Sequence, residues 1–256
     1  MITQYITSLR VEILKYKRTY ALALAVLAPL FISTLFTLVY FFKADKLIAP
    51  NTDGFASMLQ NSLSTVSSVF FPFYIILLAV LIHNVEHKAS SLKDLFSFPV
   101  SRFNTYLSKW VVAAFLISAS LVLYFVFSVF GAWMVSLKFP ELVSLSLPTM
   151  LLFAKRIAIV AMSSLVITAL QFLISLKWSN VVVPFGVGMV GFISGMVLIR
   201  GWKYIHYHPY VQGYMSYDAA IGHGKIALEH FLVYNAIGFV LLFVAGYLLW
   251  VKRRIA

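Results

Sequence analysis

The sequence predicts an all-α, polytopic membrane protein, and three observations support this fold class. Hydrophobic residues make up 62% of the chain and charged residues only 11%, whereas an ordinary soluble domain has roughly 25% charged residues. Several apolar runs are long enough to cross a hydrocarbon core of roughly 30 Å as helices. None of these runs alternates apolar and polar residues as a membrane β-strand does. We expect residues 1–256 to form a single transmembrane domain.

Six apolar windows define the predicted transmembrane helices. They are expected at about residues 20–42, 66–84, 110–135, 157–176, 181–199 and 231–250. The first window is too long for the apolar part of a cleavable signal peptide, and no small-residue cleavage site follows Phe42. An even number of spans places both termini on the same side of the membrane.

Basic residues indicate which side that is. Four of them lie within residues 10–18 and three more at residues 252–254, and lysine and arginine are enriched in cytoplasmic segments. We therefore expect a multi-pass protein of the inner or plasma membrane with both termini in the cytoplasm. The net charge of +12 is concentrated beside the spans, where basic residues meet anionic lipid. Nucleic acid is not an expected partner.

Lys155 and Arg156 fit this orientation less well, because they fall at the outer end of the fourth predicted span. We expect their long side chains to reach the outer lipid headgroups. The alternative is that they border a cavity that opens outward.

Residues 1–18 predict an amphipathic helix that lies on the inner membrane surface. Apolar residues recur there at intervals of three and four, as on one face of a helix. These are Ile2, Tyr5, Ile6, Leu9, Ile13 and Tyr16. Most polar residues of the segment fall elsewhere on the helix.

The sequence lacks the catalytic and cofactor-binding residues that several classes of enzyme require. It has no cysteine, so disulfides, thiolate metal sites and a cysteine nucleophile are excluded. The segment "GHGK" at residues 222–225 lacks the spacing and the hydroxyl residue of a phosphate-binding loop. The spans hold no carboxylate pair of the kind common in proton-coupled carriers, and no nucleophile with a base and an orienting acid can be assembled. We expect no catalytic residue and no bound cofactor.

The string "GVGMVG" at residues 186–191 resembles a dinucleotide-binding fingerprint, but no strand precedes it and no acidic residue follows at the required distance. Gly188, Gly191 and Gly195 recur at intervals of three and four. Such spacing removes side chains from one helix face and allows another segment to approach closely. We interpret these glycines as helix-packing residues.

Residues 200–230 form the longest predicted outer loop. Its histidines, His206, His208, His223 and His230, raise the hypothesis of a metal site, but no cysteine or acidic cluster completes a ligand set. The loop is also rich in aromatic residues, which favour the membrane interface. We expect Trp202, Tyr207, Tyr210 and Tyr214 to belong to a substrate-contacting or outer-gate loop.

Residues 86–102 interrupt the apolar sequence on the expected cytoplasmic side. The part from Glu86 to Leu95 predicts a short helix, Pro99 ends it, and Ser101 is placed to cap the next helix. A helix, a break and a second helix at the membrane surface could transmit force to the two adjoining spans. The residues alone are equally typical of an ordinary interfacial loop.

At this segment the chain resembles the type-2 ABC transporter permease family, particularly its short six-span members in lantibiotic immunity and bacitracin resistance exporters. The similarity consists of Glu86, then "SSLKDL" at residues 90–95, then "FPVSRFNTYLSK" at residues 98–109. The family pattern is an acidic residue, a run of small hydroxyl, leucine and basic residues, then Pro-x-Ser-Arg and a tyrosine before Ser-Lys. Ser90 stands where the family often has glycine.

The resemblance implies a transport subunit that works with a second, identical or similar permease, with membrane lipid and with two cytoplasmic ATPase subunits, which would bind ATP and Mg. Residues 86–102 would then be the segment that couples to the ATPase. Its implied contact residues are Glu86, Ser91, Leu92, Lys93, Leu95, Phe98, Pro99, Ser101 and Arg102. The family implies export of an amphipathic peptide, antibiotic or lipid-linked substrate. An ATP-independent carrier or assembly scaffold, or a lipid-modifying membrane enzyme, is the alternative.

Overall fold

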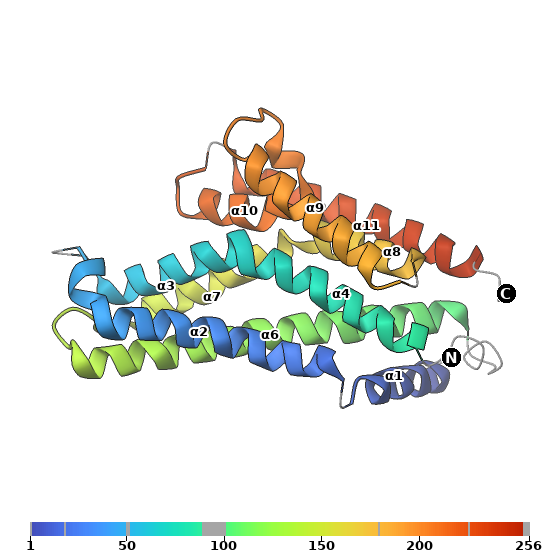
Figure 1. Cartoon of the computed structure of the whole chain (residues 1–256), viewed down its shortest axis with the longest axis horizontal. Helices are drawn as coiled ribbons and strands as arrows, with labels where there is room; N and C mark the ends of the chain where they lie inside the picture. The colour runs from blue at the N-terminus through green and yellow to red at the C-terminus, as the bar shows by residue number, and fades with distance from the viewer. Residues whose placement is uncertain are drawn as a thin grey trace.

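The computed structural model describes residues 2–17, 19–49, 52–88, 101–178, 180–224 and 226–252. Within these ranges every regular element is a helix. Most of the helices run along the long axis of the molecule (Figure 1). The first helix, α1 (Ile2–Tyr16), and the C-terminal end of the last helix, α11 (Leu228–Lys252), lie at the same end of the molecule in Figure 1. The all-helical fold class expected from the sequence is therefore present.

Helices α2 (Tyr20–Leu47) and α6 (Arg102–Lys138) pack side by side along most of their length. The Oγ atoms of Ser33 and Ser128 lie 3.1 Å apart in the buried contact between them. Further along, Lys138 Nζ donates to a backbone carbonyl of α2 at 2.9 Å. Helix α1 (Ile2–Tyr16) precedes α2 and packs against the first part of α6.

Pro29 interrupts the hydrogen bonding of α2, because proline has no N–H to donate to the carbonyl of residue 25. Ser120 of α6 supplies a replacement donor, since its Oγ lies 2.9 Å from the Ala25 carbonyl oxygen and 2.8 Å from the Leu116 carbonyl oxygen of its own helix, between which its hydrogen is shared. Tyr74 is hydrogen-bonded to the same hydroxyl, with an oxygen to oxygen distance of 2.5 Å. A buried serine thus compensates for the proline in the neighbouring helix.

The second apolar run belongs to one long helical stretch made of α3 (Gly54–Thr65), the π-helix η1 (Val66–Phe70) and α4 (Phe71–Lys88). The span expected at residues 66–84 is therefore only the later part of this stretch. Asp53 caps its start, because the carboxylate accepts from the backbone N–H groups of residues 55 and 56. Polar residues lower the hydropathy of α3, yet some of them are buried: Ser62, for example, bonds to Tyr124 at 2.6 Å.

The fourth apolar run is divided between α7 (Leu147–Met162) and α8 (Leu165–Lys177), which bend by 41° at their junction. The span expected at residues 157–176 thus begins within α7 and crosses the bend. Asn235 stabilises the broken region, because its Oδ1 accepts from the backbone N–H of Val166 in the first turn of α8 at 3.2 Å.

Lys155 and Arg156 lie in the middle of α7, because this helix begins eight residues before them at Leu147. They do not lie at its outer end, where the apolar window had placed them. Helix α10 packs against α7, and Arg156 lies in the neighbourhood of Tyr217 of α10. The two basic residues are therefore at the level of α10.

The described part of the chain after α8 contains three α-helices, α9 (Val182–Leu198), α10 (Gln212–Ala220) and α11 (Leu228–Lys252). The short 3-10 helices η2 (Ile205–Tyr207) and η3 (Pro209–Val211) lie in the connection between α9 and α10. The connection does not remain wholly on the surface, because Tyr210, Gln212 and Tyr217 are buried. Asn235 Nδ2 donates to Gln212 Oε1 at 3.0 Å and joins α11 to α10. Residues 205–220 therefore return into the helical bundle.

Among the described residues, four helical stretches are long and apolar enough to cross a membrane: Tyr20–Leu47, Gly54–Val85, Arg102–Lys138 and Leu228–Lys252. A fifth is reached if α7 and α8 form one bent span. Helix α9 is apolar but has only 17 residues, which is near the lower limit for a spanning helix. The described helices thus support a multi-pass membrane protein with four or five spans by length and composition.

The Ser120 contact gives a first prediction. Ser120→Ala removes the donor that compensates for Pro29 and the hydrogen-bond partner of Tyr74, and leaving such buried groups unsatisfied costs about 1–3 kcal/mol. We expect a lower thermal midpoint of the purified protein in detergent. Ser118→Ala, at an exposed position of the same helix, is the control and should leave the midpoint unchanged. Equal midpoints for the two variants would contradict this role of Ser120.

Candidate functional site

The segment expected to contact an ATPase lies between α4 and α6. Glu86 is in the last turn of α4, and Ser101 immediately precedes α6. Ser101 caps α6 as the sequence predicts, because its Oγ accepts from the backbone N–H of Asn104 at 3.2 Å. The remaining predicted contact residues lie outside the described part of the chain; they are Ser91, Leu92, Lys93, Leu95, Phe98 and Pro99.

Arg102 ties the start of α6 to the end of α11. Its Nη1 donates to the Val251 carbonyl oxygen at 2.6 Å, and its own carbonyl accepts from Trp250 Nε1 at 3.2 Å. The last carbonyls of a helix lack partners within the helix and carry partial negative charge, so a guanidinium is a favourable partner there. The last residue of the coupling segment is thus held by the C-terminal helix of the same chain.

A buried ion pair joins α1 to α6 at the same end of the molecule. Glu12 Oε1 lies 3.4 Å from Lys109 Nζ, and each residue is only 1% exposed. Lys15 Nζ donates to Glu12 Oε2 at 2.8 Å, and Tyr16 donates its hydroxyl to Glu12 Oε1 at 2.9 Å. The ammonium of Lys109 also lies 5.3 Å from the centre of a Trp250 ring. We call Glu12, Lys15, Tyr16, Lys109 and Trp250 the inner cluster.

Burial by itself would raise the pKa of Glu12. The ammonium groups of Lys109 and Lys15, with hydrogen bonds from Lys15 and Tyr16, outweigh that effect and hold the Glu12 pKa below its usual value. Burial, together with the adjacent Glu12 charge, raises the pKa of Tyr16. Glu12 is therefore an ionised carboxylate and Tyr16 a neutral hydrogen-bond donor.

The face of α1 that contacts the bundle differs from its apolar stripe. Ser8 and Glu12 are buried, together with Tyr16 as the one fully buried member of the stripe among the described side chains, and Ser108 Oγ donates to Ser8 Oγ at 3.2 Å. The apolar side chains of Ile6 and Ile13 are exposed. Sequence periodicity could not find this arrangement, because the buried face is largely polar. The charge pattern could have indicated an ion pair, since Glu12 is the first acidic residue of the chain and basic residues surround it.

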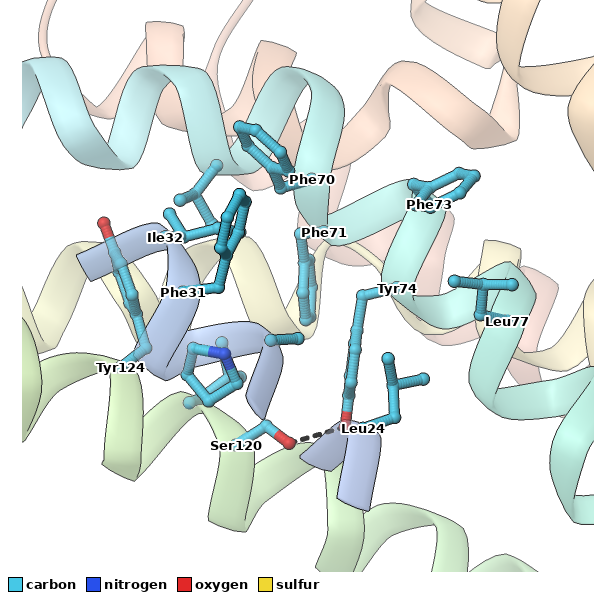
Figure 2. A pocket seen from close by; sticks show the side chains of 14 residues that line it. Leu24, Phe31, Ile32, Phe70, Phe71, Phe73, Tyr74, Leu77, Ser120 and Tyr124 are labelled. Atoms are coloured by element: carbon cyan, nitrogen blue, oxygen red, sulfur yellow. Dashed lines mark hydrogen bonds between the residues drawn. The ribbon is translucent and has the colours of Figure 1, made fainter. Parts of the chain in front are cut away.

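An apolar cavity of about 230 Å³ lies between α2, η1, α4 and α6. Aromatic side chains form a large part of its wall: Phe31, Phe70, Phe71, Phe73, Tyr74 and Tyr124. Figure 2 shows the Tyr74 hydroxyl turned toward Ser120, to which it is hydrogen-bonded. The described residues of its lining include no charged side chain, so the cavity suits a hydrocarbon or aromatic group.

The predicted helix-packing glycines of α9 face close neighbours. A Cβ at Gly188 would come within 2.5 Å of Gln171 Nε2 and 2.7 Å of a methyl carbon of Ile76. A Cβ at Gly191 would collide with the Tyr210 ring, and one at Gly195 would meet Val211 at 2.8 Å. This face of α9 therefore packs against α4, α8 and the segment at residues 209–211 that returns into the bundle.

The aromatic residues of the predicted outer loop have different environments. Tyr210 is buried and accepts a hydrogen bond from Gln171 Nε2 at 2.6 Å. Trp202 and Tyr207 are exposed, whereas Tyr214 is half-buried. No group of three or more histidines or acids in the described residues is arranged to hold a metal ion. The sequence alone could not show that Tyr210 is buried while other aromatic residues of the loop are exposed. The contact with Gln171 forms only because residues 205–220 fold back into the bundle.

The long apolar helices of the described chain define a multi-pass membrane protein. Residues 8–195 match the family described as ABC-2 family transporter protein, and the chain belongs to this family. It is thus a membrane permease component of an ABC transporter, and the family implies association with ABC ATPase subunits. The matched region includes Glu12, Lys109 and the coupling segment. No curated protein matches the chain.

The inner cluster gives a second prediction. Glu12→Gln preserves shape but removes the negative charge that faces the buried ammonium of Lys109, and breaking a buried ion pair costs about 3–5 kcal/mol. We expect a clear fall in thermal midpoint, and partial recovery when Lys109→Met is added to Glu12→Gln.

Lys15→Gln is the matched control, since Lys15 is less buried than Lys109 and its loss should cost less. The Glu12, Lys109 double-mutant cycle measures the interaction itself. Additive effects of the two substitutions would show that the pair is not coupled.

The glycine face of α9 gives a third prediction. Alanine at position 188 must displace Gln171 or Ile76, and such overpacking costs about 1–3 kcal/mol. We expect Gly188→Ala to lower the thermal midpoint. Gly186→Ala adds the same methyl group to the same helix, where nothing lies within 4 Å of the new Cβ. A Gly186→Ala protein at least as unstable as the Gly188→Ala protein would contradict the packing role of Gly188.

Proposed function

We propose that this chain is the membrane-spanning half of an ATP-driven exporter of an amphipathic substrate. It would pair with a second permease, identical or similar, and with cytoplasmic ATPases that bind ATP and Mg. The observation that carries the proposal is the inner cluster, which fixes the helices beside the coupling segment to one another. Family membership supports the permease role.

The proposed motion begins at the coupling segment and passes into α6. This helix has 37 residues, so it is about 55 Å long and extends beyond a hydrocarbon core of roughly 30 Å. Its start is held by Arg102 to α11 and by Lys109 to α1. A push from an ATPase would therefore move α6 together with α1 and the end of α11, as a connected body.

The apolar cavity would respond to this motion because of the helices that line it. Helix α6 follows the coupling segment, α4 precedes it, and α2 packs along α6. Pro29 and η1 interrupt regular helical hydrogen bonding on two walls of the cavity, and such interruptions are common where helices bend or function. ATP-driven displacement would thus change the shape of the cavity and its access.

The proposed topology has six spans: α2, α3 with α4, α6, α7 with α8, α9, and α11. Helix α9 has 17 residues and a length of about 26 Å, which crosses most of a hydrocarbon core. Contacts of α1 with α6 and of Arg102 with Val251 place both ends of the described chain at one end of the bundle (Figure 1). Together with the basic residues near both termini, this supports a cytoplasmic location for them.

The ATPase contact would be formed by the residues that the resemblance implies. Leu92, Leu95, Phe98 and Pro99 would supply its apolar part, and Glu86, Lys93 and Arg102 its charged part. The likeness of the segment at residues 86–109 to lantibiotic immunity and bacitracin resistance permeases supports a peptide, antibiotic or lipid-linked substrate and outward transport.

Purification of the complex from its host gives a fourth prediction. The tagged wild-type chain should bring down an ATP-binding cassette ATPase. Leu92→Asp places a charge in the expected apolar contact and should abolish permease-stimulated ATP hydrolysis, while the permease remains folded in the membrane. Leu92→Met keeps an apolar side chain of similar volume and should preserve hydrolysis.

Two results would count against the proposal. Absence of any ATPase from the wild-type preparation would favour an ATP-independent carrier or scaffold. Normal hydrolysis by an assembled Leu92→Asp complex would locate the ATPase contact elsewhere on the chain.

A further inference from the structure

A second cavity, of about 900 Å³, lies between η1, the end of α9 and α10. Its volume falls in the range of small-molecule sites, about 300–1,000 Å³. Unlike the apolar cavity, it has a mixed lining of cationic, hydroxyl, aromatic and aliphatic groups. In the proposed topology it lies on the outer side of the protein.

The charges of this cavity favour an anion. Arg200 and Lys203 line it with the imidazoles of His206 and His223, whereas Asp218 is the one carboxylate among the described residues of the lining. Among the residues that the structure describes, no carboxylate lies within ion-pair distance of Arg200 or Lys203. Both side chains belong to exposed residues, so their donors can reach a ligand.

Ser64, Thr65 and Ser68 also line the cavity, and the hydroxyl groups of the last two already donate to backbone carbonyls. Thr65 Oγ1 donates to the carbonyl of residue 61 at 3.1 Å, and Ser68 Oγ donates to the Thr65 carbonyl at 3.2 Å. Recognition of an anion therefore depends chiefly on Arg200 and Lys203. A guanidinium and an ammonium on one rim are well suited to phosphate oxygens, which accept charge-assisted hydrogen bonds.

The rest of the lining suits the apolar part of the same ligand. Met196, Val211 and Phe231 contribute aliphatic and aromatic surface, and Trp202 and Tyr214 lie beside them. Trp202 is exposed next to the end of the apolar helix α9, a position typical of the membrane interface. A ligand could thus place a charged headgroup at Arg200 and Lys203 and a hydrocarbon chain along the apolar wall.

We propose that this cavity binds the phosphate headgroup of an anionic lipid, with Arg200 and Lys203 as the phosphate ligands. The inference rests on the proposed function for its location and deepens it, because it narrows the amphipathic substrate class to phosphate-bearing amphiphiles. A cationic peptide is disfavoured at this cavity, since two fixed cations would face it.

The test measures binding to the full chain in detergent, without an ATPase. Dioctanoyl phosphatidic acid is the probe, dioctanoyl phosphatidylcholine tests the need for an anionic headgroup, and inorganic phosphate tests the need for a chain. The wild-type protein should bind phosphatidic acid at least tenfold more tightly than either of the other two. Arg200→Gln with Lys203→Gln should weaken that binding at least tenfold.

Lys43→Gln with Lys46→Gln is the matched control. It removes the same number of charges from the last part of α2, at residues that do not line the cavity, and should change affinity less than twofold. Thermal midpoints of both double variants within a few degrees of wild type would show that they are folded.

Three results would overturn the inference. They are equal affinity for phosphatidylcholine, equal affinity for inorganic phosphate, and equal loss of affinity in the control variant. None of these results affects the outcome of the ATPase copurification and hydrolysis experiments. The lipid-binding inference and the exporter proposal can therefore fail independently.

Discussion

The ion pair between Glu12 and Lys109 fixes the arrangement of the inner end of this permease. Both charges are almost completely removed from solvent, and a buried charge is costly unless an opposite charge and hydrogen bonds compensate for it. Helix α1 must therefore stay against α6. Because Lys109 also lies over Trp250, and Trp250 donates to the Arg102 carbonyl, the same arrangement holds the end of α11. Three helices meet directly beside the segment that is proposed to receive force from the ATPase.

The rest of the bundle combines long helix contacts with a few local interruptions of the helices. Helices α2 and α6 pack along most of their length, so they are suited to move together. Pro29, η1 and the junction of α7 with α8 interrupt regular hydrogen bonding, and Ser120 and Asn235 from neighbouring helices satisfy backbone groups at two of these places. The apolar cavity borders the first two interruptions, where a change in helix bend would alter its shape.

Hydropathy accounts for much of the fold, because the apolar runs at residues 20–42, 181–199 and 231–250 coincide with α2, α9 and α11. Hydropathy does not predict the start of α3, because polar residues such as Ser62 are buried there against Tyr124. Asp53, a strong capping residue, indicates where this helix begins. The bend after Met162 and the return of residues 205–220 depend on partners far along the chain, such as Asn235 and Gln171. Glu12 was assigned to a surface helix because periodicity describes apolar faces, and the buried face of α1 is polar.

The most direct test of the connected inner end is a disulfide between α1 and α6. The chain has no cysteine, and the hydroxyl oxygens of Ser8 and Ser108 lie 3.2 Å apart, so Ser8→Cys with Ser108→Cys places a single reactive pair at this contact. ATP hydrolysis by the reconstituted transporter is then measured before and after oxidation, with the single variants as controls. If α1 and α6 move together, hydrolysis should stay within twofold when the disulfide closes. Loss of hydrolysis on oxidation, restored by a reductant, would show that α1 must separate from α6 during transport and would contradict the account.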